Sequence, residues 1–148
     1  MYALFASDRA KYMGGPVAPQ QMWYWMASEV GSWSLKGFGS WGIERTEDGA
    51  FLGQVGINQP YHFPEPELGW VLLKHAEGQG FAFEAATAVL NWWWQTSQAN
   101  TLVSYITPGN TRSETLATRL GATPDAAGPW PTGEDAPETT VYRHRRPQ

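Results

Sequence analysis

The feature that most constrains the fold is a glycine-rich turn that leads directly into a long amphipathic helix. It lies in the stretch KHAEGQGFAFEAATAVLNWWW, residues 74–94. Small and apolar residues recur there at the spacing i, i+3, i+4, i+7, which predicts a helix from about Gly80 to Gln98 with one buried face. That face consists of Ala82, Ala85, Ala86, Val89, Leu90 and Trp93.

The turn itself allows two interpretations. A helix N-terminus carries unpaired N–H groups and a partial positive charge, and glycines before it let an anion approach the backbone. EGQGFA, residues 77–82, can therefore bind a phosphate, or it can be only a tight turn in which Gly78 and Gly80 relieve steric crowding. It lacks the G-K-[ST] ending of a Walker A loop and the three glycines of a dinucleotide-binding fingerprint.

The rest of the chain predicts further helices around a set of strands. A short helix is expected before Gly14-Gly15, and a second from about Pro19 to Leu35. We expect Met22, Met26, Val30 and Trp33 on the buried face of this second helix. A third helix is expected within residues 110–122.

Five segments predict strands. Residues 39–45 and 50–59 flank a turn at 47–49 and predict a hairpin. Residues 67–73, 101–107 and 138–145 predict three more strands, and a loop rich in proline spans residues 123–137. Strands that come before, between and after helices predict an α+β fold with a mixed sheet.

Composition excludes several classes of protein. The 148 residues predict one domain over 1–148, and the absence of cysteine excludes disulfides and thiolate metal sites. We expect no metal. A net charge of −4 argues against a nucleic-acid partner, and no apolar run is long enough for a membrane span. No signal peptide is visible, so a cytoplasmic location is expected.

Several motifs in order resemble those of the GNAT superfamily of acetyl-CoA-dependent N-acetyltransferases. The family motif Q/R-x-x-G-x-G/A opens a helix after a strand, and EGQGFA stands in its place here. The second landmark, N-x-x-S/A closed by L-G-A/F, corresponds to Asn110, Ser113 and the Leu120-Gly121-Ala122 end. PEPELGWVLL resembles the central strand and GAFLGQVGI the strand before it. The resemblance covers residues 23–122 and is closest to ribosomal-protein Nα-acetyltransferases.

Two departures from the family accompany this resemblance. Glu77 stands where Gln or Arg is usual, and because a carboxylate repels a diphosphate, we expect its side chain to point to solvent. The usual first strand is also not visible at the start of the sequence, so we expect that it is absent, lost through a wrongly assigned start codon, or supplied by another segment. The resemblance thus implies a GNAT fold, with a mostly antiparallel sheet flanked by helices, that lacks this strand.

The resemblance implies a set of donor-binding residues. The pantetheine arm of acetyl-CoA enters a gap between the strands 67–73 and 101–107, and the diphosphate binds backbone N–H groups at the start of the helix. The implied residues are Val71, Leu72, Leu73, Gly78, Gln79, Gly80, Phe81, Ala82 and Asn110.

The resemblance implies that Glu67 is the general base, because a glutamate that opens this strand has that role in other branches of the superfamily. Glu65 and His62 are rivals. Many relatives use a tyrosine as general acid seven residues after the motif asparagine, a position that Ala117 holds here. Ser113 is the nearest replacement. Each of these residues can equally be an ordinary surface side chain.

Aromatic residues and one histidine are candidates for the acceptor pocket, although each can instead be core or surface. They are Trp23, Tyr24, Tyr61, His62, Trp130 and Tyr142. Trp92, Trp93 and Trp94 cannot share one helix face. Since Trp93 is on the buried one, Trp92 or Trp94 can cover the sheet rim or a partner subunit in a homodimer.

The resemblance therefore implies an N-acetyltransferase. It would move an acetyl group from acetyl-CoA to a primary amine, either a protein N-terminus or a small amine, by direct attack in a ternary complex. One alternative is a GNAT-fold module that binds acyl-CoA without turnover. Another is an enzyme of a different class that binds a nucleotide phosphate at the turn.

Overall fold

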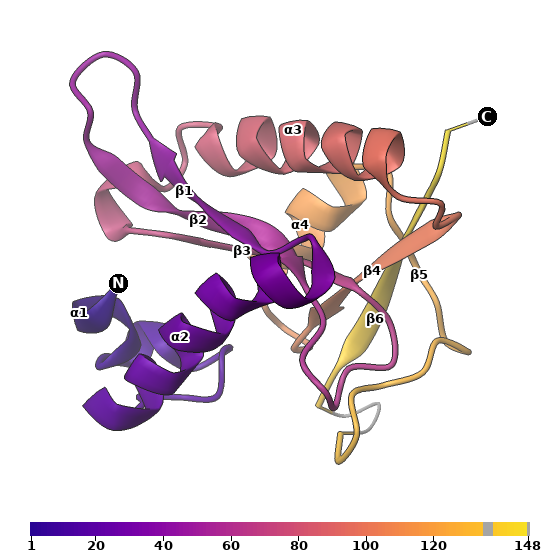
Figure 1. Ribbon diagram of the computed structural model, residues 1–148, viewed down its shortest axis with the longest axis horizontal. Helices are drawn as coiled ribbons and strands as arrows, with labels where there is room; N and C mark the ends of the chain where they lie inside the picture. The colour runs from indigo at the N-terminus through magenta and orange to yellow at the C-terminus, as the bar shows by residue number, and fades with distance from the viewer. Residues whose placement is uncertain (135–137, 148) are drawn as a thin grey trace.

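The protein is built on one mixed sheet, as the sequence predicts, but among the described residues it has six strands and not five, because Thr123–Pro124 pairs within the segment predicted as a loop. A computed structural model describes residues 1–134 and 138–147, so part of the predicted loop 123–137 lies outside the described residues. The strand order is β1-β2-β3-β4-β6-β5, and only the central β3–β4 pair is parallel (Figure 1). The strands are β1 (Ser40–Glu44), β2 (Phe51–Asn58), β3 (Glu67–Leu72), β4 (Thr101–Ile106), β5 (Thr123–Pro124) and β6 (Thr140–Arg145).

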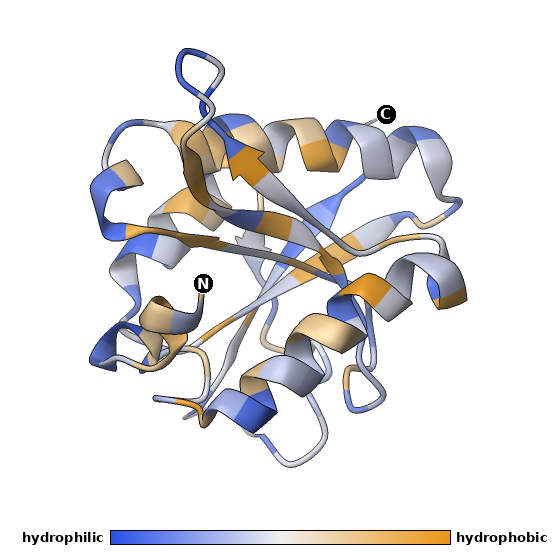
Figure 2. Ribbon diagram, turned by 60° about the vertical axis from the view of Figure 1, so that its left-hand side comes forward, coloured by the Kyte–Doolittle hydropathy of each residue, from blue (hydrophilic) through white to orange (hydrophobic). Residues whose placement is uncertain are grey.

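Helices cover both faces of this sheet. On one face lie α3 (Phe81–Thr96) and α4 (Thr111–Arg119), and on the other lie α1 (Tyr2–Phe5), the 3-10 turn η1 (Asp8–Ala10) and α2 (Pro19–Lys36) (Figures 1 and 2). A short 3-10 turn η2 (Lys74–Ala76) joins β3 to the glycine-rich turn. As the sequence predicts, the described residues before α2 contribute no strand to the sheet.

The predicted apolar face of α3 forms the main core. Ala86, Val89, Leu90 and Trp93 pack on Val55, Ile57, Leu68 and Leu102 from the three central strands. Trp92 lies against Trp41 of β1, with ring centroids 4.9 Å apart, so it covers the sheet rim as predicted. This packing fixes the start of α3 beside the end of β3.

The buried face predicted for α2 is wrong. Met22 is buried, but Met26 and Val30 are 43% and 74% exposed, and Trp25 and Glu29 turn inward instead. At 100° per residue, Glu29 lies only 20° from Met22 around the helix, whereas Val30 lies 80° away. Apolar spacing misses this face because one of its inward-facing residues is a carboxylate.

The two central strands separate almost at once. β3 and β4 pair only at Glu67 and Val103, whereas β2 and β3 pair along their whole length. Beyond this pair, side chains bind the backbone groups that strand pairing would otherwise satisfy. The Ser104 hydroxyl donates to Leu68 O at 2.7 Å, and the Glu67 carboxylate accepts from Tyr105 N–H at 3.3 Å. These bonds satisfy backbone groups without strand pairing, so the strands diverge into a fork.

The β1–β2 pairing depends on the lack of a side chain at Gly56. A Cβ atom there would lie 2.3 Å from the Cα of Ser40, its partner on β1. We expect Gly56→Ala to lower the free energy of unfolding by about 3 kcal/mol, because the backbones must separate to admit the methyl group. Urea unfolding measures this change.

Gly42→Ala is the matched control, because a Cβ at Gly42 meets only the side chain of Phe51, at 3.2 Å. Equal losses of stability in the two variants would contradict the account of a backbone clash.

Candidate active site

Two cavities meet at the fork between β3 and β4. The first, of about 1000 Å³, opens between α2 and the sheet, and the second, of about 1310 Å³, reaches the N-terminus of α3. Six residues line both cavities: Tyr12, Met13, Trp70, Val71, Asn110 and Ser113. Molecules bound in the two cavities can therefore touch one another at the fork.

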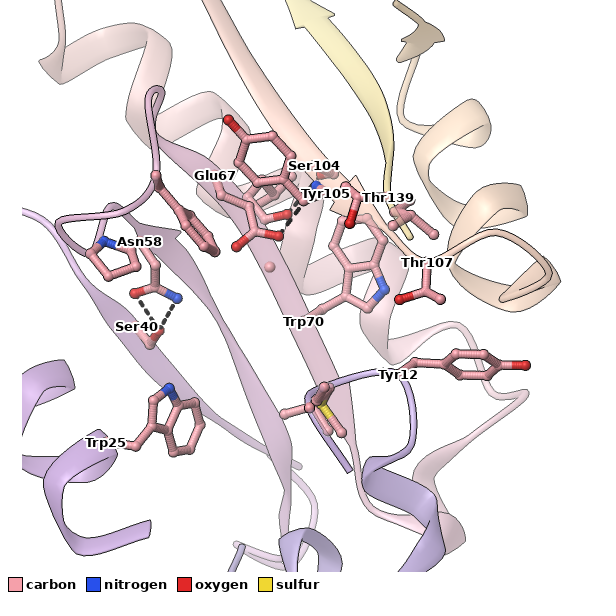
Figure 3. A pocket seen from close by; sticks show the side chains of 18 of the residues that line it. Tyr12, Trp25, Ser40, Asn58, Glu67, Trp70, Ser104, Tyr105, Thr107 and Thr139 are labelled. Carbon is pink, nitrogen blue, oxygen red and sulfur yellow. Dashed lines mark hydrogen bonds between the residues drawn. The ribbon is translucent and has the colours of Figure 1, made fainter. Parts of the chain in front are cut away.

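Glu67 projects into the first cavity from the start of β3 (Figure 3). Within the described part of the chain, its only hydrogen bond is the one from the Tyr105 N–H. Burial raises the pKa of Glu67 to about 7 against the effect of that N–H, and the carboxylates of Glu134 and Glu29 add to the rise. A carboxyl group with this pKa can accept a proton at neutral pH, as a general base must.

The acidic side chains in the described lining of the first cavity are not balanced by any lysine or arginine. Its lining contains four carboxylates, Glu29, Glu67, Glu134 and Glu138, and no lysine or arginine among the described residues. Aromatic side chains, including Trp25, Trp70 and Tyr105, also line this cavity (Figure 3). Carboxylates and aromatic faces both attract cations.

Glu29 reaches this cavity from α2. Burial raises its pKa, and a hydrogen bond with the Ser40 hydroxyl partly opposes the rise. Ser40 in turn hydrogen-bonds the Asn58 side chain at 3.2–3.3 Å (Figure 3). Among the described residues, Glu29 forms no ion pair, so its charge is available to a cationic ligand.

The second cavity ends at the bare N-terminus of α3. Gly80 precedes the helix with φ +89°, and no side chain caps the first turn. Gly78 also has a left-handed φ, +74°, so both glycines give the turn a conformation that other residues rarely adopt. The free N–H groups of this first turn can bind an anion.

The predicted donor-binding residues lie around this cavity with three exceptions. Val71, Leu72, Gly78, Gly80, Ala82 and Asn110 line it. Gln79, Phe81 and Leu73 do not: the Gln79 amide turns back to His75 O at 2.6 Å, and Leu73 N–H pairs with Leu52 O of β2.

Backbone direction alternates along β3. Leu68 O accepts from Ser104 on the side of β4, and Leu72 O accepts from Arg9 at 3.4 Å on the same open edge. Since strand groups alternate with period two, Trp70 and Leu72 present their backbone N–H and C=O groups to the fork, and Val71 does not.

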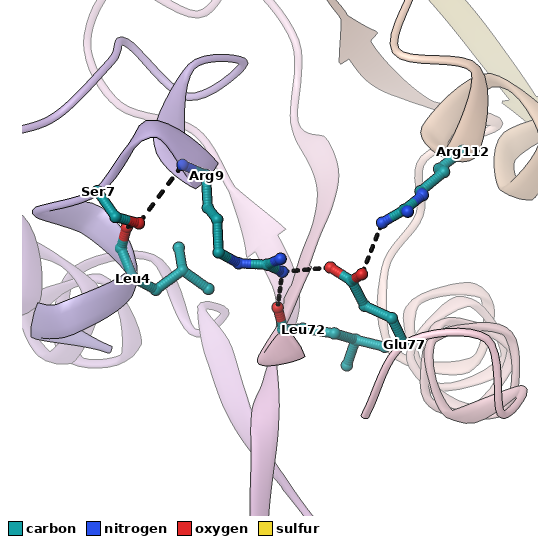
Figure 4. Close-up of polar contacts among 6 residues, drawn as sticks. All are labelled: Leu4, Ser7, Arg9, Leu72, Glu77 and Arg112. Carbon is teal, nitrogen blue, oxygen red and sulfur yellow. Dashed lines mark hydrogen bonds and ion pairs between the residues drawn. The ribbon is translucent and has the colours of Figure 1, made fainter. Parts of the chain in front are cut away.

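Glu77 does not point to solvent, contrary to the expectation from sequence. Its carboxylate is held between the guanidinium groups of Arg9 and Arg112, and its side chain is 28% exposed (Figure 4). Burial alone would raise the pKa of Glu77, but the hydrogen bonds and charges of the two arginines outweigh it and lower the pKa. The two positive charges explain why a carboxylate is tolerated beside an anion site.

Asn110 and Ser113 lie where α4 begins. The Asn110 side chain accepts the Ser113 N–H at 3.5 Å and so caps the helix, and both residues line the junction of the two cavities. Ala117, at the position of the tyrosine in many relatives, is fully buried one turn further on. Ser113 is thus the hydroxyl that α4 presents to the junction.

Of the predicted acceptor-pocket residues, only His62 lines the first cavity. Trp23 is 61% exposed on the outer side of α2, and Tyr61 is fully exposed at a loop tip. Tyr142 is buried in the core formed with Ile106 and Ala117. Tyr24 and Trp130 also lie outside the lining.

Glu65, the rival base, is engaged elsewhere. Both of its oxygens accept from Arg143, at 2.7 and 2.8 Å, in a pairing that ties the loop before β3 to β6. Asp125 binds the same guanidinium. Glu65 therefore holds the loop in position and does not line either cavity.

Sequence reasoning missed the buried Ser104–His144 pair. Ser104 lines the first cavity, and its Oγ lies 3.1 Å from Nε2 of His144 on β6. Because the hydroxyl proton goes to Leu68 O, Nε2 must be the protonated nitrogen, and burial lowers the pKa of His144 to about 4. The neutral imidazole fixes the hydroxyl that separates the strands. Both residues read as ordinary strand positions in the sequence.

The fold, with two cavities that meet at the fork, is that of a known class of acyl-transferring enzymes. A family model described as an acetyltransferase (GNAT) domain matches residues 1–123. The chain belongs to the GNAT family of acetyltransferases, which use acetyl-CoA as the acetyl donor.

Known relatives agree with this assignment. An acetyltransferase from Agrobacterium tumefaciens is 38% identical, with a TM-score of 0.89, over 97% of this chain and 82% of that one. A ribosomal-protein-S5-alanine acetyltransferase from Vibrio fischeri shares the fold, with a TM-score of 0.64 at 15% identity over 87% and 73% of the two chains. The uncharacterized Bacillus subtilis protein YkkB is 34% identical over 90 residues, which are 58% of this chain and only 52% of YkkB.

Two further features can be stated for the described residues. None of their helices is long and apolar enough to cross a membrane. They also hold no cluster of three or more side chains suited to bind a metal ion.

The raised pKa of Glu67 makes stability depend on pH. The folded state binds a proton more tightly than the unfolded chain, whose pKa is 4.5, so stability falls as pH rises from 4.5 through about 7. We expect Glu67→Gln, which cannot ionise, to be more stable than the natural protein by about 2 kcal/mol at pH 8 and nearly equal at pH 4.

Urea unfolding at both pH values measures the difference, and the exposed Glu84→Gln serves as control. A difference that is the same at pH 4 and pH 8 would show that Glu67 is not desolvated as described.

Proposed function

We propose that this chain transfers an acetyl group from acetyl-CoA to a primary amine by direct attack in a ternary complex, with Glu67 as the general base. The observation that carries the proposal is the position of Glu67. It is an enclosed carboxyl with a pKa of about 7, in an acidic cavity that joins a basic one at the fork.

The donor fits the second cavity. Arg9, Lys11, Lys74, Arg112 and Arg119 line it against Asp8 and Glu77, so its net charge is positive. The diphosphate would bind the free N–H groups of the α3 N-terminus. The amide-rich pantetheine arm would then pair with the open edge of β3 at Trp70 and Leu72, as an added strand does. Its thioester would reach the junction.

The chemistry then needs three groups. Glu67 takes a proton from the acceptor ammonium, and the neutral amine attacks the thioester carbonyl. A backbone N–H on the open edge of β3, such as that of Leu72, stabilises the oxyanion. The C–S bond breaks as the amide forms, and the second proton of the attacking nitrogen passes through the Ser113 hydroxyl or a water to the departing thiolate.

The acceptor should be an amine whose other groups are cationic or neutral. The four carboxylates of the first cavity favour a second positive charge, and they repel a carboxylate on the acceptor. This description admits a small diamine, or a protein N-terminus that has no acidic residue beside it. Glu29, which lines the same cavity from α2, would bind the second cation.

The pH dependence of transfer tests the base. Release of CoA with saturating amine should rise with pH through an apparent pKa near 7, because only the ionised Glu67 accepts a proton. We expect Glu67→Gln to lower kcat by about 100-fold. The exposed Glu47→Gln, remote from both cavities, is the matched control. Transfer by Glu67→Gln with an unchanged pH profile would exclude the base, and donor binding without release for any amine would indicate a binding module.

The acceptor class is tested in the same assay with a linear diamine, an ω-amino acid of equal length, and a short peptide with a free N-terminus. We expect kcat/KM for the diamine to exceed that for the amino acid by about tenfold or more, and Glu29→Gln to reduce the ratio. A faster reaction of the peptide would favour an N-terminal acceptor, and equal rates for the diamine and the amino acid would contradict the electrostatic argument.

A further inference from the structure

Glu77 links three separate segments at the mouth of the donor cavity. Arg9 comes from the 3-10 turn before α2, Glu77 from the loop after β3, and Arg112 from the first turn of α4 (Figure 4). Arg9 Nη2 donates to one carboxylate oxygen, and Arg112 Nη1 donates to the other at 2.6 Å. All three residues line the cavity that ends at the α3 N-terminus.

The Glu77 carboxylate lies where the diphosphate of a bound donor is expected. A guanidinium offers N–H donors in a planar fork that suits carboxylate and phosphate oxygens alike. A diphosphate has more oxygens and more charge than a single carboxylate. It can therefore compete with Glu77 for the donors of Arg9 and Arg112.

Exposure favours such an exchange. The Arg112 side chain is 80% exposed and that of Arg9 is 35% exposed, so neither ion pair is deeply buried. Exposed ion pairs contribute little to stability and can rearrange at small cost. Arg9 also donates to Leu72 O, so its guanidinium lies directly beside the open edge of β3.

We propose that Arg9 and Arg112 are binding residues for the donor diphosphate, and that Glu77 competes with it for both guanidinium groups. Binding of the donor exchanges the Glu77 carboxylate for phosphate oxygens, so Glu77 weakens donor affinity. The inference rests on the proposed function in one respect, because it takes a CoA thioester as the donor. Gln or Arg at the position of Glu77 would place N–H donors within the glycine-rich turn. Here such donors come from two side chains outside it, Arg9 and Arg112.

Calorimetric titration of CoA into three variants tests this proposal. Glu77→Gln keeps the size of the side chain but removes its charge, and we expect it to bind CoA about three- to tenfold more tightly than the natural protein. Arg112→Gln removes a donor from an exposed position and should bind CoA more weakly by a similar factor.

Glu47→Gln is the matched control for charge. Glu47 is exposed in the turn between β1 and β2, it lines neither cavity, and its side chain forms no hydrogen bond or ion pair with any other described residue. Its removal changes the net charge by the same amount without releasing either arginine, so we expect less than about a twofold change in affinity.

The outcomes separate this inference from the proposed function. If Glu77→Gln binds CoA no more tightly than Glu47→Gln does, competition is excluded. Weaker binding would show that Glu77 positions the arginines for the ligand, which also overturns the proposal. If the natural protein does not bind CoA at all, the proposed function itself fails. Thermal unfolding of each variant without CoA confirms that the affinities refer to folded protein.

Discussion

The active-site geometry depends on the early separation of β3 and β4. Two parallel strands in the middle of a sheet would normally stay paired, because unpaired backbone groups are costly when buried. Here the Ser104 hydroxyl and the Glu67 carboxylate bind the first backbone groups beyond the single bridge at Val103. The same carboxylate thus helps to open the fork and stands ready to accept a proton within it.

The fork also separates charge. Basic side chains surround the cavity at the α3 N-terminus. The described lining of the other cavity contains four glutamates and no lysine or arginine. An anionic donor and a cationic acceptor are thereby directed to opposite sides of the open strand edge. The high pKa of Glu67 follows from this arrangement, since burial and neighbouring carboxylates both oppose its ionisation.

Sequence patterns predicted the fold where one physical signal dominated. The apolar period of α3, the hairpin turn and the strand of Glu67 are all local signals, and all three elements form close to their predicted bounds. Patterns failed where a polar group faces inward. With Glu29 facing inward, α2 is rotated about its own axis relative to the orientation that its apolar residues predict.

The same limit applied to the site. The position of Glu67 in a cavity followed from the family motif, but Arg9 lies 68 residues from Glu77 and no spacing rule connects them. The Ser104–His144 pair is likewise formed by two strands that meet only in the folded sheet. Trp23, Tyr61 and Tyr142 were chosen for their side-chain type, which does not tell a pocket from a surface or a core.

Amide hydrogen exchange, measured by NMR with and without CoA, tests the central claim most directly. If the pantetheine arm pairs with the open edge of β3, CoA slows exchange at Trp70 and Leu72 and in the first turn of α3. It leaves Leu73, whose N–H already pairs with Leu52 O, unchanged. Protection confined to the α3 turn, with no change at Trp70 and Leu72, would contradict the account.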